Sequence, residues 1–320
     1  MKGSSTTPLI FQNAKVPVEN LLYKVGKGAT IAFNVLNIGR FKLGASSVGG
    51  AKLVINGSSQ YAQERRAFGQ SISNFDAIIK KIANMTVRTF AADSMTYRTI
   101  GLLQNEIDQL DKSSPDYHIQ LGEAMEEFAI ETSMVKVYGS DTSHYVIDEG
   151  LQIFGGYGLL EEYPLAGAYR DDRINQIWEG TNEINRQIIA GFMMKKALME
   201  ELPVRDAIRD ISDYMSNGQL KFDDNTLAGE CQSIETAKRL ALYLFNEALC
   251  EYGQDLKHEQ QLTEIFADIF TDIFTAESTV VRARKIMASD SPESTVSDIA
   301  KVFTAEMGSR IMGNVHNAIG

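Results

Sequence analysis

The segment Ile177–Ile184, IWEGTNEI, places one carboxylate directly before a stretch whose apolar residues recur at helical spacing. Glu179 lies between Trp178 and Gly180, and a carboxylate packed against an indole is poorly solvated, so its pKa rises toward neutrality. Such a carboxylate can remove a weakly acidic C–H proton at physiological pH. Thr181 is a candidate N-cap, and the helix after it would offer free N–H groups to a phosphate or a carbonyl oxygen. Taken alone, the segment fits a plain loop with an N-cap equally well.

Composition limits the classes of protein to consider. The chain has 320 residues and a net charge of −11, which allows two domains and argues against nucleic-acid partners and anionic membranes. No run of about eighteen apolar residues occurs, so no membrane span is expected. Cys231 and Cys250 are too few for a disulfide scaffold, and a reducing compartment is expected. The four histidines are scattered without ligand spacing, so no metal site is expected.

The start of the chain reads as extended. Leu9–Phe11 is a short β run, and Pro17 excludes a helix over the residues around it. An isolated strand is not stable. The strand is therefore expected to belong to a sheet, and the chain to be a fragment of something longer.

Helical periodicity dominates from residue 29 onward. The pattern predicts four long helices: about 29–64, one beginning at a capping box of Ser73 and Asp76, one around 125–135, and one over 182–199. Short turns between them predict an antiparallel four-helix bundle in an all-α fold. After a loop over 217–225, a second helical bundle is expected, with its clearest helices around 262–273 and 296–307. This second unit carries no cluster of chemical residues and reads as a packing or assembly module.

Two further motifs carry candidate binding residues. Residues 151–158, LQIFGGYG, let the backbone approach a flat ligand or a pyrophosphate, although such a stretch is more often a helix C-cap and turn. Residues 65–69, RRAFG, offer a guanidinium and an aromatic ring, although a surface salt bridge is the commoner role for such an arginine.

In this order and spacing, the motifs closely resemble the C-terminal half of the acyl-CoA dehydrogenase family. The matching pieces are 16–22, 36–41, 65–69, 151–158, 169–171 and 177–184. Residues 37–41 and the appended helical unit look most like the very-long-chain branch. The resemblance implies a remnant of the family's middle β-domain over 1–27, its C-terminal helical bundle over 28–200, and an additional helical domain over 201–320.

The resemblance also implies an activity. The family oxidises an acyl-CoA thioester to the trans-2-enoyl-CoA in fatty-acid β-oxidation, using FAD and passing electrons to an electron-transferring flavoprotein. A glutamate removes the α-proton while the β-hydrogen leaves as hydride to flavin N5, and Glu179 stands at the position of that glutamate. Some relatives place the base just before the arginine that matches Arg40. That position is Gly39 here, so the assignment falls on Glu179.

The same resemblance assigns binding roles to further residues. Those implied at the cofactor are Arg65, Phe68, Gln152, Ile153, Gly155, Gly156, Thr181 and Glu183. Arg65 and Phe68 would reach the FAD of a partner subunit, which implies a homodimer. Those implied at the substrate are Asn37, Arg40, Trp178 and Gly180.

Parts of the family pattern have no counterpart in this sequence. The N-terminal helical domain and nearly all of the middle domain are missing, so the chain is expected to be inactive as isolated. A non-catalytic helical assembly module and an acyl-CoA oxidase are the alternative readings. Membrane attachment is not expected, because no basic amphipathic helix occurs. The absence of organelle signals suggests a bacterial cytoplasm.

Overall fold

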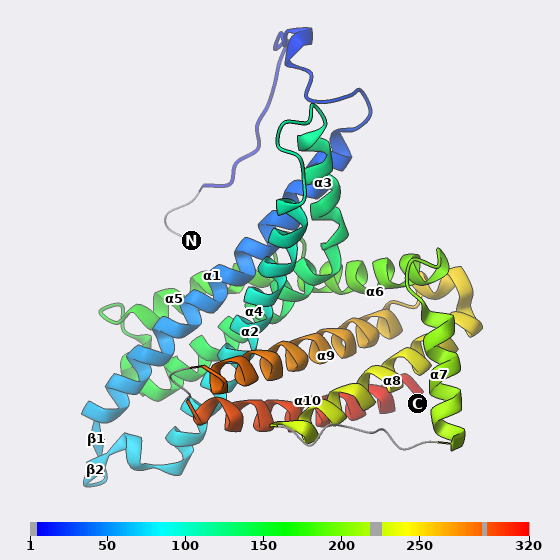
Figure 1. The fold of residues 1–320 in the computed structure, drawn as a ribbon. Coiled ribbons are helices and arrows are strands. Elements are labelled where there is room, and N and C mark those ends of the chain that lie inside the picture. The colour runs from blue at the N-terminus through cyan, green and yellow to red at the C-terminus, as the bar shows by residue number, and fades with distance from the viewer. Residues whose placement is uncertain (1–4, 218–225, 290–292, 320) are drawn as a thin grey trace.

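The computed structural model describes residues 5–217, 226–289 and 293–319 (Figure 1). The first eight elements are η1 (Val18–Asn20), α1 (Gly28–Glu64), β1 (Arg66–Ala67), β2 (Gln70–Ser71), η2 (Ile72–Asn74), α2 (Asp76–Asp108), α3 (Tyr117–Glu127) and α4 (Ala129–Phe154). The remaining elements are η3 (Gly155–Leu159), α5 (Pro164–Asp172), η4 (Arg173–Gln176), α6 (Asn182–Leu198), α7 (Val204–Asn217), α8 (Ala228–Tyr252), η5 (Gly253–His258), α9 (Gln260–Met287) and α10 (Thr295–Ile319). Over these described ranges, no helix is both long and apolar enough to cross a bilayer.

The predicted helical bundle is confirmed, with α4 lying against α1, α2 and α6. The helices α1 and α4 approach each other closely because glycines face each other across the contact. A Cβ atom on Gly139 would lie 2.9 Å from the Cα of Gly44, and one on Gly44 would lie 2.5 Å from the carbonyl oxygen of Val135. The glycines of α1 therefore serve helix packing at this contact.

Two local predictions within the bundle are wrong. Ser73 and Asp76 form no capping box, because Ser71 caps the short helix η2 and α2 begins after Phe75. The helix expected around 125–135 is interrupted at Phe128, where α3 ends and α4 begins.

The C-terminal helices pack directly on the bundle (Figure 1). Val87 and Ala91 of α2 share one buried core with Ile273 of α9 and Phe303 of α10. Ala267 of α9 belongs to a second core with residues of α2, α4 and α6. The helix α9 thus bridges the bundle and the last helices, while the proposed division at residue 200 stays a prediction. Apart from Asn217, the loop expected over 217–225 lies outside the described residues.

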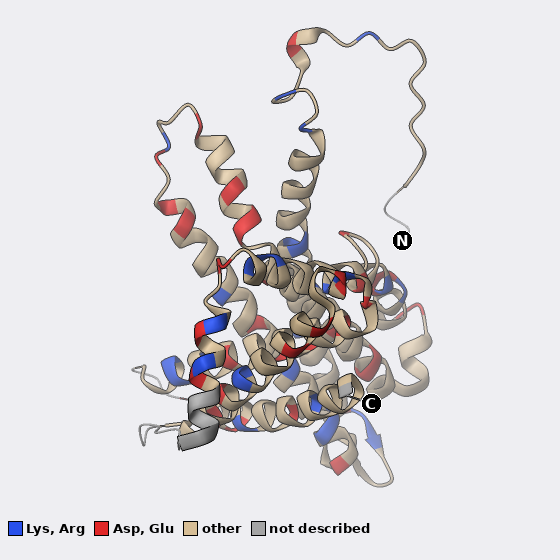
Figure 2. Ribbon diagram, turned by 90° about the vertical axis from the view of Figure 1, so that its right-hand side faces the viewer, with Lys and Arg blue, Asp and Glu red and all other residues tan. Residues whose placement is uncertain are grey.

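The strand expected near the start is absent. Leu9, Ile10 and Phe11 lie in irregular backbone with each side chain more than three-quarters exposed. Figure 2 shows this segment running apart from the helices. A strand needs a neighbour for its N–H and C=O groups, and among the described residues no backbone hydrogen bond joins residues 9–11 to another segment. Within the described ranges, the sheet consists of the hairpin β1–β2 alone.

Candidate functional site

The loop formed by residues 177–181 joins η4 to α6 and carries Glu179. Thr181 is the N-cap that the sequence predicts, because its hydroxyl accepts a hydrogen bond from the N–H of Ile184 over 3.3 Å. Glu179 and Gly180 have φ angles of 58° and 82°. A glutamate in this left-handed region is uncommon, and the conformation persists only where the surroundings hold it.

Buried donors hold the backbone of this loop. The amide of Asn185 donates to the carbonyl oxygens of Gly180 over 2.8 Å, Thr181 over 3.0 Å and Glu179 over 3.4 Å. Arg40 of α1 donates from Nε to the Glu179 carbonyl over 3.2 Å. Asn185 is fully buried and Arg40 nearly so, which makes both donors fixed parts of the core.

The carboxylate of Glu179 lies against α1 at a glycine. A Cβ atom on Gly39 would lie 2.7 Å from Cδ of Glu179 and closer still to one carboxylate oxygen. Beside Gly39 on α1, Arg40 Nη1 donates to Asn37 Oδ1 over 2.7 Å. Burial lowers the pKa of Arg40, and the Glu179 carboxylate acts in the opposite direction. The structure therefore brings Asn37, Arg40 and Glu179 together, as predicted.

The indole does not bury the carboxylate as the sequence suggested. Trp178 is 42% exposed, and its Nε1 donates to Asn175 Oδ1 over 3.2 Å. The close neighbour that the structure shows for the carboxylate is the backbone of α1. Within the described residues, the carboxylate accepts no hydrogen bond and joins no ion pair.

The start of α6 already holds a negative charge. Glu183 lies exposed in the first turn, where its own N–H and then the Thr181 hydroxyl lower the pKa of its carboxyl. An anion that approaches these N–H groups therefore meets a carboxylate, which weakens the predicted attraction of this helix end for phosphate.

The Gly-rich residues belong to a second group at the far end of α1. A cavity of about 440 Å³ is lined by Tyr61, Arg65, Ile72, Ile153, Phe154, Gly155, Gly156, Tyr157 and Leu160. The guanidinium of Arg65 lies 5.4 Å from the ring centroid of Tyr157. Gln152 is exposed and lies outside this lining, and so does Phe68, which is 95% exposed.

The two groups of predicted residues do not meet within one chain. Arg65 follows Arg40 by 25 residues and directly follows the last residue of α1, on which Arg40 lies. A helix rises about 1.5 Å per residue, so these positions are separated by about 37 Å. The cavity beside Arg65 and the loop that carries Glu179 are therefore separate places on the chain.

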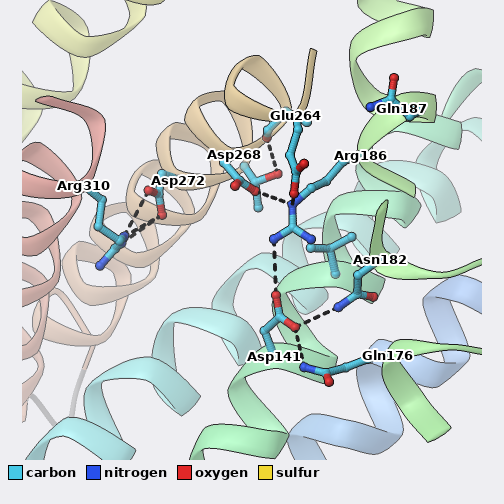
Figure 3. Close-up of polar contacts among 12 residues, drawn as sticks. Asp141, Gln176, Asn182, Arg186, Gln187, Glu264, Asp268, Asp272 and Arg310 are labelled. Atoms are coloured by element: carbon cyan, nitrogen blue, oxygen red, sulfur yellow. Dashed lines mark hydrogen bonds and ion pairs between the residues drawn. The ribbon is translucent and has the colours of Figure 1, made fainter. Parts of the chain in front are cut away.

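Sequence reasoning missed the buried polar residues that support the loop. Lys136 of α4 is fully buried and donates to Asn182 Oδ1 over 2.6 Å, and burial lowers its pKa to about 8. Asp141 Oδ1 accepts from Asn182 and from Gln176 (Figure 3). The signal for Lys136 was a lysine inside the otherwise apolar run Met134–Val137.

Two protein-family models match separate parts of the chain. Residues 26–194 match the family "Acyl-CoA dehydrogenase, C-terminal domain", and residues 236–320 match a second family of the same description. A probable acyl-CoA dehydrogenase of Bacillus subtilis is 38% identical over 322 residues, covering 100% of this chain and 54% of that protein. The crystal structure of an acyl-CoA dehydrogenase complexed with FAD from Bacillus anthracis superimposes with a TM-score of 0.92, at 38% identity, over 97% of this chain and 53% of that one. A subunit of the caffeyl-CoA reductase–Etf complex of Acetobacterium woodii is 32% identical over 194 residues, 61% of this chain and 46% of that protein.

The chain belongs to the acyl-CoA dehydrogenase family. It spans about half the length of the first two relatives. Reductases and short-chain enzymes match alongside very long-chain ones, so the comparisons do not single out the very-long-chain branch. The roles given to individual site residues stay predictions.

Proposed function

We propose that the protein is an FAD-dependent acyl-CoA dehydrogenase of fatty-acid β-oxidation, with Glu179 as the base. The observation that carries this proposal is the contrast between the backbone and the side chain of Glu179. Its carbonyl is fixed by Arg40 and Asn185, while its carboxylate has no hydrogen-bond partner among the described residues. A base needs this combination of a fixed position and a free oxygen.

The proposed step uses groups that this chain supplies. A carboxylate oxygen of Glu179 takes the α-proton of the acyl thioester, and the electron pair left at the α-carbon forms the second bond to the β-carbon. FAD, when bound, would accept the hydride that leaves the β-carbon. The N–H of Glu179 makes no hydrogen bond within the described residues, so it is available to the thioester carbonyl oxygen, where negative charge develops.

The residues around Arg65 are the ones that we assign to FAD. Phe68 lies in a two-residue turn between β1 and β2 with φ of 52°, and it is 95% exposed. An aromatic side chain in a strained turn with almost no cover suggests a contact beyond this chain. We infer that Arg65, Phe68 and residues 152–156 contact the FAD of a partner subunit, with residues 152–156 on its adenine side. Thr181 and Glu183 contact the FAD of their own subunit. The separation of about 37 Å along α1 supports such a homodimer.

The electron acceptor follows by analogy. Because a relative belongs to a complex with Etf, we propose an electron-transferring flavoprotein as the partner. An acyl-CoA oxidase, with the same base, would pass the electrons to oxygen instead.

A chimera provides the test of this function. In the chimera, residues 1–320 of this chain follow the part of the B. subtilis relative that has no counterpart in this chain. The chimera is needed because residues 1–320 alone are expected to retain little FAD. Octanoyl-CoA or palmitoyl-CoA, added without oxygen, should bleach the flavin band of the chimera, whereas Glu179→Gln should keep FAD and remain unbleached. A chimera that holds FAD but is not bleached, or a Glu179→Gln variant bleached equally fast, would contradict the proposal.

A further inference from the structure

One carboxylate oxygen holds both ends of the loop 177–181. Gln176, at the end of η4, donates from Nε2 to Asp141 Oδ1 over 2.8 Å. Asn182, at the start of α6, donates from Nδ2 to the same oxygen over 2.7 Å. Figure 3 shows the two amides converging on Asp141. Because one amide precedes the loop and the other follows it, Asp141 links the two ends of the loop.

Asp141 is in turn tied to the second set of helices. Arg186 of α6 donates from Nη2 to Asp141 Oδ2 over 3.4 Å. From Nε it donates to Asp268 Oδ1 of α9 over 2.7 Å, and Glu264 lies 3.8 Å from the same nitrogen. A continuous line of polar contacts therefore runs from α9 to both ends of the loop (Figure 3).

The geometry at Arg186 explains how a change on α9 would reach the loop. The Arg186 side chain is only 16% exposed, so its positive charge needs negative partners within the fold. Asp268 occupies the Nε side at the shorter distance, which leaves Nη2 to make a long contact with Asp141. Without the carboxylate of Asp268, Nε keeps only the more distant Glu264 among these partners, at 3.8 Å, so the guanidinium is held less firmly and can shift toward Asp141, where it competes with the two amides.

We propose that Asp268 is a positioning residue for the loop that carries Glu179, acting through Arg186 and Asp141. The helix α9, which the sequence assigned to packing or assembly alone, thereby takes part in shaping the candidate site. The link from Asp268 to the loop does not depend on the proposed function. Only the catalytic importance of that link rests on the proposed role of Glu179.

The chain contains a single tryptophan that reports on this loop. Trp178 lies within the loop beside Glu179 and is 42% exposed, so its fluorescence and its quenching by acrylamide reflect the local conformation. The test compares the chain 1–320 with Asp268→Asn. Its matched control is Asp272→Asn, one turn further along α9. Asp272 is more buried and accepts three hydrogen bonds from Arg310 of α10, over 2.9, 3.0 and 3.1 Å, and within the described residues no hydrogen bond or ion pair joins it to Arg186 or Asp141.

We expect Asp268→Asn to raise the quenching constant of Trp178 by about half, through more frequent opening of the loop, and Asp272→Asn to leave it within about a tenth of wild type. Asp268→Glu keeps the negative charge, so its quenching constant should lie close to that of wild type. An unchanged quenching constant in a folded Asp268→Asn variant overturns the proposal, and so does an equal rise in Asp272→Asn. If Asp268→Asn does not fold by circular dichroism, Arg186→Lys takes its place, with the same expectations.

This experiment separates the inference from the proposed function. Trp178 quenching needs neither FAD nor a catalytic Glu179, whereas bleaching of the chimera needs both. A chimera that fails to bleach would remove the role of Glu179 and leave the link between α9 and the loop standing. A quenching constant unaffected by Asp268 would remove the link and leave the base in place.

Discussion

Glu179 and Phe68 share a backbone conformation that few residues of their kind adopt. Each has a positive φ and is followed by a glycine that also has one. Such a conformation costs about 1–3 kcal/mol for a residue with a side chain and persists where other contacts impose it. For Glu179 those contacts are the buried donors Arg40 and Asn185. Phe68 has a single ring contact, an edge-on approach to Phe75, and is otherwise exposed.

The turn at Phe68 gives a prediction in which stability and cofactor binding move in opposite directions. Two positive φ angles in a two-residue hairpin favour Asn-Gly over Phe-Gly. Phe68→Asn should therefore raise the free energy of unfolding of the chain by about 0.5–1 kcal/mol, measured in urea. In the chimera it should weaken FAD retention, measured by flavin absorbance after gel filtration. Phe68→Asn that retains FAD as well as wild type would refute a role of the ring at the cofactor.

Gly39 gives a prediction about the carboxylate of Glu179. A methyl group there would overlap the end of a flexible side chain rather than backbone, so the carboxylate moves and the helix does not. Gly39→Ala should slow flavin bleaching in the chimera by about a hundredfold. It should also leave stability unchanged or raise it by up to about 1 kcal/mol. Gly49→Ala is the control, because Gly49 lies on the same helix with open space around its Cβ position. Equal bleaching rates in the two variants would contradict the placement of the carboxylate.

The buried Lys136 predicts that the stability of the chain increases with pH over a defined range. Burial lowers its pKa from 10.5 to about 8, so between these values the folded chain binds fewer protons than the unfolded chain. The stability contributed by Lys136 therefore increases as pH rises through that window, by up to about 3 kcal/mol. The difference in unfolding free energy between wild type and Lys136→Met should shift in favour of wild type between about pH 7 and about pH 10. A difference that stays flat across this range would show that Lys136 keeps its ordinary pKa.

Between elements, the contact of α1 with α4 depends on glycines whose substitution meets backbone. A Cβ on Gly44 would lie 2.5 Å from the carbonyl oxygen of Val135, so two helix backbones would have to separate. Gly44→Ala should destabilise the chain by about 1–3 kcal/mol, as overpacking does. Gly49→Ala on the same helix should stabilise it by about 0.5–1 kcal/mol, because alanine is the better helix former. Urea denaturation of both variants measures the contrast, and a Gly44→Ala variant as stable as wild type would contradict this packing.

Sequence periodicity predicted which helices form better than it predicted where each helix begins and ends. The long helix α1 and the N-cap at Thr181 are confirmed, because both depend on residues close in the chain. The cap assigned to Ser73 is wrong because residues 72–74 form the short helix η2, which Ser71 caps, and α2 begins only after Phe75. The strand at Leu9–Phe11 does not form, since a strand depends on a partner and no local pattern supplies one.

For the candidate site too, the sequence predicts local features better than contacts between distant residues. The motif containing Glu179 was visible in one octapeptide, whereas its supports are distant in sequence. Asp141 lies 41 residues before Asn182, and Arg186 lies 82 before Asp268. Nothing in a local pattern pairs such residues. The indirect link from α9 to the loop, through Arg186 and Asp141, could therefore be found only once the helices were placed in space.

The distance between Glu179 and Arg65 leads to a prediction for the whole dimer. If each site takes Glu179 from one chain and Arg65 from its partner, a Glu179→Gln chimera and an Arg65→Ala chimera are each inactive alone. Refolded together, half of the dimers are mixed, and each mixed dimer holds one site with both residues intact. The mixture should then bleach flavin with about one quarter of wild-type activity. Two copies of one variant, refolded in the same way, form the control and should stay inactive. A mixture that is no more active than either variant alone would mean that Glu179 and Arg65 of the same chain serve one site. That result would contradict the inference drawn from their separation of about 37 Å along α1.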